Sequence, residues 1–443
     1  MKPFGILLIV ATAAFPAFQL FAHQNVPDQI ALFSQYLGLA ALILMAWAQI
    51  LSTRSPGIEL IFGGLDRIYV LHKWAGVSAM AAILLHDTID AEMRGLGRET
   101  ALNEIAETLG EISLYGLLIL VVLSVATFVP YHLWKWTHKA MGALFAAGSF
   151  HFFFIMKPFA MSDPAGLYTG AFCIAGLAAY IWMLLPDHLR PSTRYSVTEL
   201  EETGGALAIT LTPVGKPLKA NPGQFGVLRF ADSRISEPHP FSFSKITNDG
   251  SLGVTVKPLG DFTTRLGASL EVGCDVRIQG PFGRFRFSGK SPEVWIAGGI
   301  GVTPFLTWAQ ALDVDHAPVD FFYCAKSRKD APHLDKLEAL ATSKANLNLH
   351  LMFSSENRRL SADAISEVST CDLSQAKVSV CGPVSLRNSL QDGLRRFGVG
   401  PRRFHYEEFE FRTGIGLKSL AGWLVERGKR SGIQDTVTAN SRH

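Results

Sequence analysis

The chain has 443 residues, which is too long for one hydrophobic core and predicts about three structural units. Hydrophobic residues make up 48% of it and charged residues only 18%, below the roughly one quarter that is usual in soluble domains. The formal net charge of +3 gives no basis for binding nucleic acid. Five scattered cysteines without a Cys-x-x-Cys spacing argue against a disulfide framework and against a cysteine-held cluster.

The first 190 residues are apolar and carry little charge. A membrane-spanning helix needs roughly 20 apolar residues. Six segments meet this requirement, at about 4–22, 30–51, 68–86, 111–129, 133–156 and 166–185. The first segment has a second interpretation as a signal peptide, because Lys2 precedes a short apolar run. This half therefore predicts an all-α transmembrane bundle of six helices.

The basic residues between these segments predict the orientation of the bundle. If the N-terminus lies inside, eight lysines and arginines fall on the inner side: Lys2, Arg54, Arg67, Lys73, Lys135, Lys139, Arg190 and Arg194. Only three fall on the outer side: Arg94, Arg98 and Lys157. Because inner loops of membrane proteins are enriched in such residues, we expect the N-terminus and everything after residue 190 to be cytoplasmic.

Two predicted spans contain histidines, and ionisable side chains inside a membrane are costly and usually functional. The third span carries His72 and His86, and the fifth carries His138 and His151. The first two share a helix face about 21 Å apart, and the second two lie about 19.5 Å apart along their own axis. Since both helices run the same way, His72 pairs with His138 near the cytosol and His86 with His151 near the outer face. Paired imidazoles at two depths are what two stacked b-type haems require.

The fifth span fits this arrangement less simply. Thirteen residues rotate an ideal helix by about 1300°, which leaves His151 about 140° from the face of His138. Uneven winding near Gly142, Gly148 and Ser149 is therefore expected. The alternative for membrane histidines is an interhelical hydrogen bond without a metal. A zinc-type site is not indicated, because no carboxylate or cysteine stands within a turn on the same face.

After Pro186 and Pro191 the pattern changes to short alternating strands with glycine-rich turns, which is typical of a small antiparallel barrel. The expected strands are 195–200, 206–212, 225–230, 253–257 and 275–279. From about residue 291 strands alternate with helical stretches, which predicts a doubly wound α/β domain.

Three runs of residues in this half are candidate cofactor-binding motifs. The run His239-Pro240-Phe241-Ser242 can lay a strand along a flavin ring and offer the Ser242 hydroxyl to its edge, although a plain hydrophobic strand explains it equally well. The run Gly260-Asp261-Phe262-Thr263 places glycine and hydroxyls at a helix start, which suits a pyrophosphate held by backbone N–H groups. The run Gly298-Gly299-Ile300-Gly301-Val302-Thr303 joins an apolar strand to a helix, which suits a dinucleotide. A strand–turn–helix without a ligand is the alternative for this third run.

Together these features resemble the NADPH oxidase and ferric reductase family over residues 1–412. The resemblance rests on the two histidine pairs, on the three runs above, and on Cys381-Gly382-Pro383 after the strand at 378–380. It implies a ferredoxin reductase-like module with FAD between the nicotinamide and the inner haem.

The resemblance also implies roles for single residues. Residues 239–242 would contact the isoalloxazine, and Gly260 to Thr263 the FAD phosphates. The residues that would contact NAD(P)H are Gly298, Gly299, Gly301, Thr303, Cys381 and Gly382. Phe409 would be the closing aromatic that covers the flavin, with Phe411 as the second candidate.

Ser327 and Arg328 follow the predicted strand 321–324, where ferredoxin reductase relatives bind the 2′-phosphate. A guanidinium suits a phosphate, so NADPH is favoured over NADH.

Two features depart from the family pattern. Residues 413–443 extend beyond it, and their apolar spacing and basic residues predict either an amphipathic helix on the inner membrane surface or a loose tail. The loop from Asp87 to Glu111 carries seven acidic residues against two arginines, whereas dioxygen-reducing relatives tend to place basic groups beside the outer haem. Ferric complexes therefore stay open as acceptors beside dioxygen.

The sequence thus predicts a multi-pass protein of the cell inner membrane with four parts. These are a haem domain at 1–190, an FAD-binding β-barrel at 191–290, an NAD(P)-binding α/β domain at 291–412 and a tail at 413–443. It would pass electrons from cytosolic NAD(P)H through FAD and two b-type haems to a small-molecule acceptor, dioxygen or a ferric chelate. The alternatives are a haem relay subunit that feeds a periplasmic protein, and a haem-free membrane protein with an appended flavin reductase.

Overall fold

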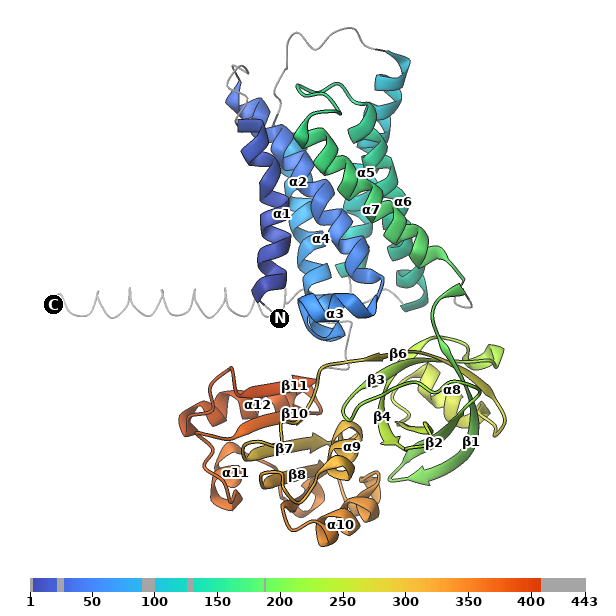
Figure 1. The fold of residues 1–443 in the computed structure, drawn as a ribbon, viewed down its shortest axis with the longest axis vertical. Helices are drawn as coiled ribbons and strands as arrows, with labels where there is room; N and C mark the ends of the chain where they lie inside the picture. Colours follow the sequence, from blue (N-terminus) through green and yellow to red (C-terminus); the bar gives the residue numbers. More distant parts are fainter. Residues whose placement is uncertain (1–2, 22–27, 90–99, 126–130, 187–188, 408–443) are drawn as a thin grey trace, which may run out of the picture. The chain divides into compact units, whose positions relative to one another are not determined.

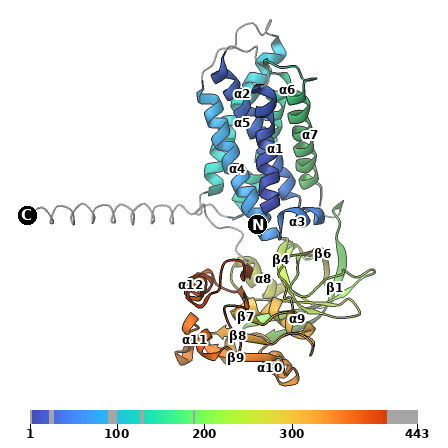
Figure 2. The same ribbon diagram turned by 60° about the vertical axis from the view of Figure 1, so that its left-hand side comes forward.

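The structure is a computed structural model that describes residues 3–21, 28–89, 100–125, 131–186 and 189–407. Its contacts divide the chain into two compact units (Figures 1 and 2). The helical unit contains the described parts of 3–53 and 69–184. The sheet unit contains Arg54–Ile68 together with the described residues from Leu185 onward. The segment Arg54–Ile68 therefore belongs with a part of the chain that lies far from it in sequence.

Six long helices confirm the predicted all-α region. They are α1 (Pro3–Phe21), α2 (Gln29–Ser52), α4 (Leu65–Thr88), α5 (Ala101–Val125), α6 (Tyr131–Phe154) and α7 (Pro164–Leu184). Among the described residues five helices are long and apolar enough to cross a membrane by length and composition, and α6 is not one of them. Lys135, Lys139 and the histidines of α6 lower its mean hydropathy.

Two local features differ from the prediction. Helix α5 begins at Ala101 rather than near residue 111, so Glu104, Glu107 and Glu111 are exposed residues of a helix and not of a loop. A hydropathy window cannot detect this first part, because its apolar residues are interrupted by acidic ones that face outward. The short helix α3 (Pro56–Phe62) was not predicted, because seven residues are too few to give a helical repeat.

Helix α6 runs as a continuous α-helix between the two histidines that were expected to need uneven winding. Ser149 donates a hydrogen bond to the carbonyl of Phe145, one turn earlier (2.9 Å). Phe145 is fully buried, and a Cβ at Gly176 of α7 would lie only 2.7 Å from its ring. Phe145 therefore packs in the core of the helical unit.

The first part of the sheet unit is a closed antiparallel barrel, as predicted. Its strands lie in the order β1-β2-β5-β4-β3-β6. Their bounds are β1 (Thr193–Thr203), β2 (Ala206–Pro213), β3 (Phe225–Phe230), β4 (His239–Ile246), β5 (Leu252–Val256) and β6 (Asp275–Phe282). The barrel is filled by alternating apolar side chains such as Leu211, Phe243 and Val254, and α8 (Asp261–Ser269) adds Phe262 and Leu266 to this core.

The second part is the predicted doubly wound α/β fold, a parallel sheet in the order β11-β10-β7-β8-β9. Its strands are β7 (Glu293–Gly298), β8 (Val319–Ala325), β9 (Leu347–Phe353), β10 (Lys377–Cys381) and β11 (Phe404–Glu407). Its helices are α9 (Thr303–Ala311), α10 (Leu334–Ser343), α11 (Ala362–Val368) and α12 (Val384–Leu394). The strand order reverses between β7 and β10, which is where open α/β sheets bind ligands.

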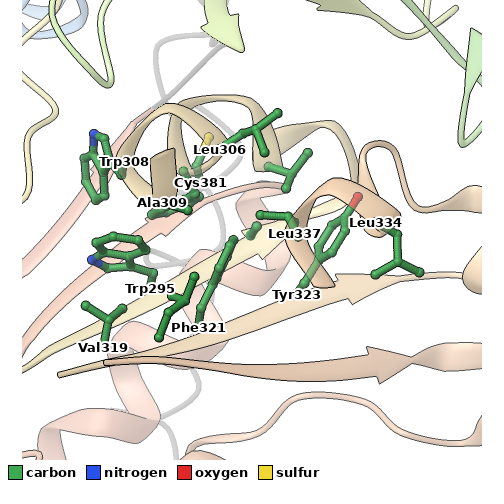
Figure 3. Packing of buried hydrophobic residues seen from close by; sticks show 14 of the residues in the cluster. Trp295, Leu306, Trp308, Ala309, Val319, Phe321, Tyr323, Leu334, Leu337 and Cys381 are labelled. Atoms are coloured by element: carbon green, nitrogen blue, oxygen red, sulfur yellow. The ribbon is translucent and has the colours of Figure 1, made fainter. Parts of the chain in front are cut away.

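Alternating residues of β7 fill two cores. Trp295 packs with residues of α9 and α10, such as Trp308 and Leu337, on one face of the sheet (Figure 3). Val294 and Ile296 pack with residues of α11 and α12 on the other face. The strand is therefore buried on both sides, as a central parallel strand must be.

Candidate functional site

The inner pair of histidines lies where two helices of the helical unit approach each other. The ring centroids of His72 on α4 and His138 on α6 are 5.8 Å apart. Nδ1 of His72 hydrogen-bonds to the carbonyl of Ala48 on α2 at 2.9 Å, and Nδ1 of His138 to Oγ of Ser124 on α5 at 3.2 Å. Trp134 stacks on His138 at 4.9 Å and 18°. Both rings are thus oriented by groups on neighbouring helices.

The outer pair is held in the same way. Nδ1 of His86 lies 2.8 Å from the carbonyl of Ser34 and 2.9 Å from its Oγ, and Nδ1 of His151 lies 2.9 Å from the carbonyl of Ala106. His86 and His151 are close enough to interact electrostatically. A Cβ at Gly110 on α5 would lie 2.5 Å from Nδ1 of His151, so only glycine leaves room for this ring. Both histidines of α6 reach α5 without a break in the helix.

These contacts fix the tautomers. A backbone carbonyl only accepts hydrogen bonds, so Nδ1 of His72, His86 and His151 carries the proton. The lone pair of each ring is then on Nε2, and second-sphere contacts of this kind are typical of histidines that bind metal. The part of the chain that the structure describes holds no group of three or more His, Cys, Asp or Glu side chains that could bind a metal.

The predicted flavin run lies on β4 of the barrel. Ser242 pairs in register with Phe225 of β3, is 5% exposed, and has no hydrogen-bond partner for its Oγ among the described residues. A buried hydroxyl without a partner is unfavourable by roughly 1–3 kcal/mol, and a ligand acceptor at the ring edge of a flavin would relieve it. The residues present therefore fit the group that the sequence predicts.

The second predicted run is brought to the first by an aromatic stack. The ring of His239 lies on the ring of Phe262 with centroids 3.6 Å apart and planes within 7°. This contact joins β4 to the start of α8. The Thr263 hydroxyl accepts from the backbone N–H groups of Leu259 (2.9 Å) and Gly260 (3.1 Å), so it orders the turn itself. A Cβ at Gly260 would meet nothing within 4 Å, which leaves the helix start open to an anion.

The third run and the turn after β10 meet at the reversal of strand order. A Cβ at Gly301 would lie 2.2 Å from the carbonyl oxygen of Cys381, and one at Gly298 would lie 3.3 Å from Cα of Gly382. These glycines therefore pack backbone against backbone. Gly299 differs, because it has φ +55° and its added Cβ would face open space. Of the four, Gly299 is the one placed for close approach of a ligand.

Three predicted nucleotide residues are engaged with the protein. Thr303 at the start of α9 is buried and donates to the carbonyl of Ile300 (3.2 Å). The Ser327 hydroxyl donates to the Asp330 carboxylate at 2.5 Å. The guanidinium of Arg328 binds both carboxylate oxygens of Glu338, at 2.6 and 2.5 Å, and the Arg328 side chain is 57% exposed. A 2′-phosphate at this place would have to compete with a carboxylate.

Cys381 ends β10, and its sulfur lies among Leu306 and Ala309 of α9 (Figure 3). Burial raises the pKa of this thiol well above its usual range, and the charge of Glu407 adds to the effect. The sulfur therefore stays a neutral, space-filling group. Phe409, Phe411 and the tail from 413 lie outside the described residues.

Glu59 and Arg67 were not singled out in the sequence. Glu59 on α3 is 8% exposed and accepts hydrogen bonds from the backbone N–H groups of Leu65 (2.9 Å) and Gly283 (3.1 Å). Arg67 donates to the hydroxyl of Tyr406 on β11 (2.9 Å). A single acidic residue within the apolar run at 56–62 was the signal that could have identified Glu59.

Two parts of the chain match known protein families. Residues 37–149 match the ferric reductase like transmembrane component, and residues 196–303 match the FAD-binding domain. His72, His86 and His138 fall within the first range and Ser242 within the second, whereas His151 lies two residues beyond the first.

Several curated relatives are similar to part of the chain. The chain is 26% identical over 223 residues to toluate 1,2-dioxygenase electron transfer component of Pseudomonas putida, covering 48% of this chain and 66% of that protein. It is 32% identical over 175 residues to phenoxybenzoate dioxygenase subunit beta of Ectopseudomonas oleovorans (39% and 51%). It is 23% identical over 239 residues to flavohemoprotein A of Dictyostelium discoideum (49% and 60%). The chain thus spans about two thirds or less of the length of each.

Solved structures also align with the chain. A flavohemoglobin from Malassezia yamatoensis aligns with a TM-score of 0.49 at 15% identity over 90% of this chain and 98% of that one. The FAD/NAD binding domain of nitric oxide dioxygenase from Vibrio cholerae aligns with a TM-score of 0.43 at 21% identity, over 49% and 98%.

By its fold and family matches the chain is similar to membrane oxidoreductases that use FAD and a nicotinamide nucleotide. More particularly, one chain joins a segment similar to the ferric reductase like transmembrane component, at residues 37–149, to a segment similar to an FAD-binding domain, at residues 196–303.

Proposed function

We propose that this chain passes electrons from NAD(P)H, through FAD and two b-type haems, to an external small-molecule acceptor, either dioxygen or a ferric complex. One observation carries the proposal. His72, His86, His138 and His151 each have Nδ1 hydrogen-bonded to the protein, so that Nε2 can serve as a ligand. Histidines that served only as interhelical hydrogen-bonders would not need the same nitrogen in every case.

The dimensions of the inner pair support this assignment. The ring centroids of His72 and His138 lie 5.8 Å apart, so both imidazoles could contact one group bound between them. We assign His72 and His138 to the inner haem and His86 and His151 to the outer one.

In the sheet unit we assign Ser242, His239 and the start of α8 to FAD, and the turn at Gly299 to the nicotinamide nucleotide. The bound flavin would convert a two-electron donor to the one-electron path that haem requires. Ser242 would hold the ring edge with its buried hydroxyl, and the His239–Phe262 stack would fix the strand beside it. The neutral Cys381 thiol would shape the nicotinamide end without acting as a nucleophile.

NADPH is the preferred donor in this proposal because Arg328 lies at the carboxyl end of β8, although Glu338 competes for it. We further propose that the N-terminus and the sheet unit are cytoplasmic and that the membrane is the cell inner membrane, from the excess of basic residues on that side.

The test is a set of reduced-minus-oxidised spectra of the purified chain under nitrogen, with NADPH and FAD added before air. We expect haem bands at about two haems per chain that become reduced by NADPH. His72→Gln and His86→Gln should each remove about half of the haem signal. No haem band in the wild type would refute the proposal and leave a haem-free membrane flavin reductase.

The acceptor is identified in the second step of that experiment. Rapid reoxidation by air with superoxide formation supports dioxygen, and reoxidation by ferric citrate alone supports a ferric reductase. If neither reoxidises the protein, the small-molecule acceptor is wrong and a protein partner takes its place.

A further inference from the structure

The loop after β8 ends at His333, where the barrel and the α/β fold of the sheet unit meet. This loop carries Ser327 and Arg328, and His333 is its last residue before α10. The backbone of His333 has φ +59°, which is unfavourable for a residue other than glycine. Such a conformation persists only where the surrounding contacts hold it.

The turn between β1 and β2 of the barrel holds the backbone of this loop. Oγ1 of Thr203 accepts a hydrogen bond from the backbone N–H of His333 at 2.8 Å. A Cβ at Gly204, which has φ +54°, would lie 2.2 Å from the backbone nitrogen of Pro332. Only glycine therefore lets the turn approach the loop this closely.

The side chain of His333 makes a second connection to the barrel, through two hydroxyls. Its Nε2 lies 2.7 Å from Oγ1 of Thr255 on β5, and the Thr255 hydroxyl donates to Oγ of Ser244 on β4 at 3.0 Å. Since that hydroxyl gives its only proton to Ser244, it accepts from Nε2 of His333. All three residues are buried, so water does not compete for these bonds. These three residues form the His333 bridge.

One end of the His333 bridge lies on the strand that carries the candidate flavin hydroxyl. Ser242 and Ser244 are two residues apart on β4, so their side chains point to the same face of the barrel wall. Phe243 between them packs in the barrel core. The bridge therefore joins the face assigned to the flavin to the loop assigned to the nucleotide.

We propose that His333, Thr255 and Ser244 are positioning residues for hydride transfer, which hold the nucleotide-binding part of the sheet unit at a fixed place on the flavin barrel. The inference rests on the proposed function, because it requires that NAD(P)H reduces FAD in this unit. That step moves one hydride, a proton with two electrons, from C4 of the nicotinamide to N5 of the flavin. NAD(P)H is thereby oxidised to NAD(P)+, and FAD is reduced to FADH−.

The rate of this transfer depends steeply on the distance and angle between the two reacting atoms. Binding of each cofactor, in contrast, depends on contacts within its own part of the unit. Loss of the His333 bridge should therefore lower kcat much more than it changes KM for NADPH or the affinity for FAD.

The experiment uses the full-length protein in detergent with FAD bound. Thr255→Val keeps the shape of the side chain but removes its hydroxyl, whereas Thr255→Ser keeps the hydroxyl. Both substitutions lie in the barrel and leave the residues of the nucleotide loop unchanged. Glu201→Gln is the matched control, because the exposed pair of Glu201 with Lys336 (2.8 Å) joins the barrel to α10 as well. Exposed pairs of this kind contribute little.

Three quantities are measured. The first is kcat per bound FAD, with KM for NADPH, from dichlorophenolindophenol reduction; it is repeated with NADPH that carries deuterium at the transferred position. The second is the FAD content of the purified protein, from the fluorescence of the released flavin. The third is hydrogen exchange of a peptide covering 331–337.

For Thr255→Val we expect kcat to fall about tenfold, KM to change less than twofold and FAD content to match the wild type. The isotope effect should be at least as large as in the wild type, because hydride transfer is the step that slows. Exchange of 331–337 should rise. Thr255→Ser should restore kcat, and Glu201→Gln should match the wild type in all three measurements.

A second variant tests the bridge from the loop side. His333→Asn removes Nε2 and should lower kcat as Thr255→Val does. The double variant should be no slower than the slower single variant, because both substitutions break the same hydrogen bond. Multiplied effects would show that the two residues act independently, which would contradict the bridge.

Three results would overturn the inference and leave the proposed function intact. If kcat stays unchanged in Thr255→Val although exchange rises, the bridge only stabilises the loop. If FAD is lost, the bridge supports flavin binding instead. If kcat falls and the isotope effect falls with it, a step other than hydride transfer has slowed. A wild type whose flavin NADPH does not reduce would refute the proposed function at its first step, and this inference with it.

Discussion

Gly301 and Gly299 stand two positions apart in the turn after β7, and the structure predicts opposite consequences for the same substitution. A methyl group at Gly301 would lie 2.2 Å from the carbonyl oxygen of Cys381 and 2.6 Å from its carbon. These atoms belong to β10, which is hydrogen-bonded between β7 and β11 and cannot move aside. A methyl at Gly299 would meet nothing within 4 Å, and its only cost comes from φ +55°.

The two costs differ in size. Overpacking against well-packed structure destabilises by about 1–3 kcal/mol, and a backbone neighbour places Gly301→Ala near the upper value. A left-handed conformation costs an alanine about 1 kcal/mol. In a domain of this size 1 kcal/mol shifts Tm by about 2–4 °C. We therefore expect Gly301→Ala to lower Tm by about 6–12 °C and Gly299→Ala by no more than about 4 °C.

Release of flavin fluorescence on heating measures the Tm of the full-length protein, and NADPH-driven dye reduction measures the nucleotide site. We expect Gly299→Ala to raise KM for NADPH about tenfold, because the methyl group occupies the open space where the nucleotide approaches. If Gly301→Ala unfolds within 2 °C of the wild type, the backbone packing inferred for this turn is wrong.

Three further predictions concern the sheet unit. Ser242→Ala removes a buried hydroxyl that lacks a hydrogen-bond partner among the described residues. We therefore expect the flavin-free protein to be as stable as the wild type or slightly more stable. We expect flavin reduction by NADPH to slow by about tenfold or more. Glu338→Gln frees Arg328 from its carboxylate partner, and the ratio of kcat/KM for NADPH to that for NADH should rise about threefold, the scale of an exposed ion pair. His333 is 5% exposed, and burial lowers its pKa from 6.5 to about 4. The folded protein thus favours the neutral ring, so this stabilisation is complete above pH 6.5 and is lost as the pH falls toward 4. The control variant is His333→Asn, because asparagine tolerates the left-handed backbone at this position. Between pH 7 and pH 4 the wild type should lose up to about 3 kcal/mol more stability than this variant.

Each of these predictions has a control. Ser236→Ala removes a half-buried hydroxyl of the same unit and should leave flavin reduction unchanged; an equal effect of both substitutions would exclude a specific role for Ser242. Asp363→Asn breaks the exposed pair with Arg396 and should not alter nucleotide preference, and a preference unmoved by Glu338→Gln would contradict the competition inferred at Arg328. The free energy of unfolding is measured with urea at each pH. If it falls equally with pH in the wild type and in His333→Asn, this histidine does not cause the pH dependence.

The order of the helices and strands could be predicted from the sequence, because each has a characteristic hydrophobic periodicity or composition. Apolar runs identified the six long helices, and alternating strands followed by strand–helix repeats identified the barrel and the α/β fold. The ends of the helices were less well defined. The first turns of α5 are amphipathic, with exposed Glu104 and Glu107 around buried Ala106, so a search for apolar runs missed them.

The candidate site residues remain predictions, but the structure explains why some contacts were invisible in the sequence. The histidines and glycines were found because their chemistry or size is needed at one position. The groups that orient His72, His86 and His151 are backbone carbonyls of Ala48, Ser34 and Ala106, and every residue type supplies a carbonyl. Only the fold brings those carbonyls to the rings.

The same distinction explains the contacts of Glu59. Its partners are the backbone N–H groups of Leu65 and Gly283, which follow the carboxylate by 6 and by 224 positions in the chain. The contact needs only a backbone N–H from each partner, whereas position 59 needs an acceptor, because a buried apolar side chain there would leave two N–H groups without one. When one side chain contacts two distant backbone groups, only the side chain can be recognised in the sequence. Here that side chain is Glu59, an acidic residue within an apolar stretch.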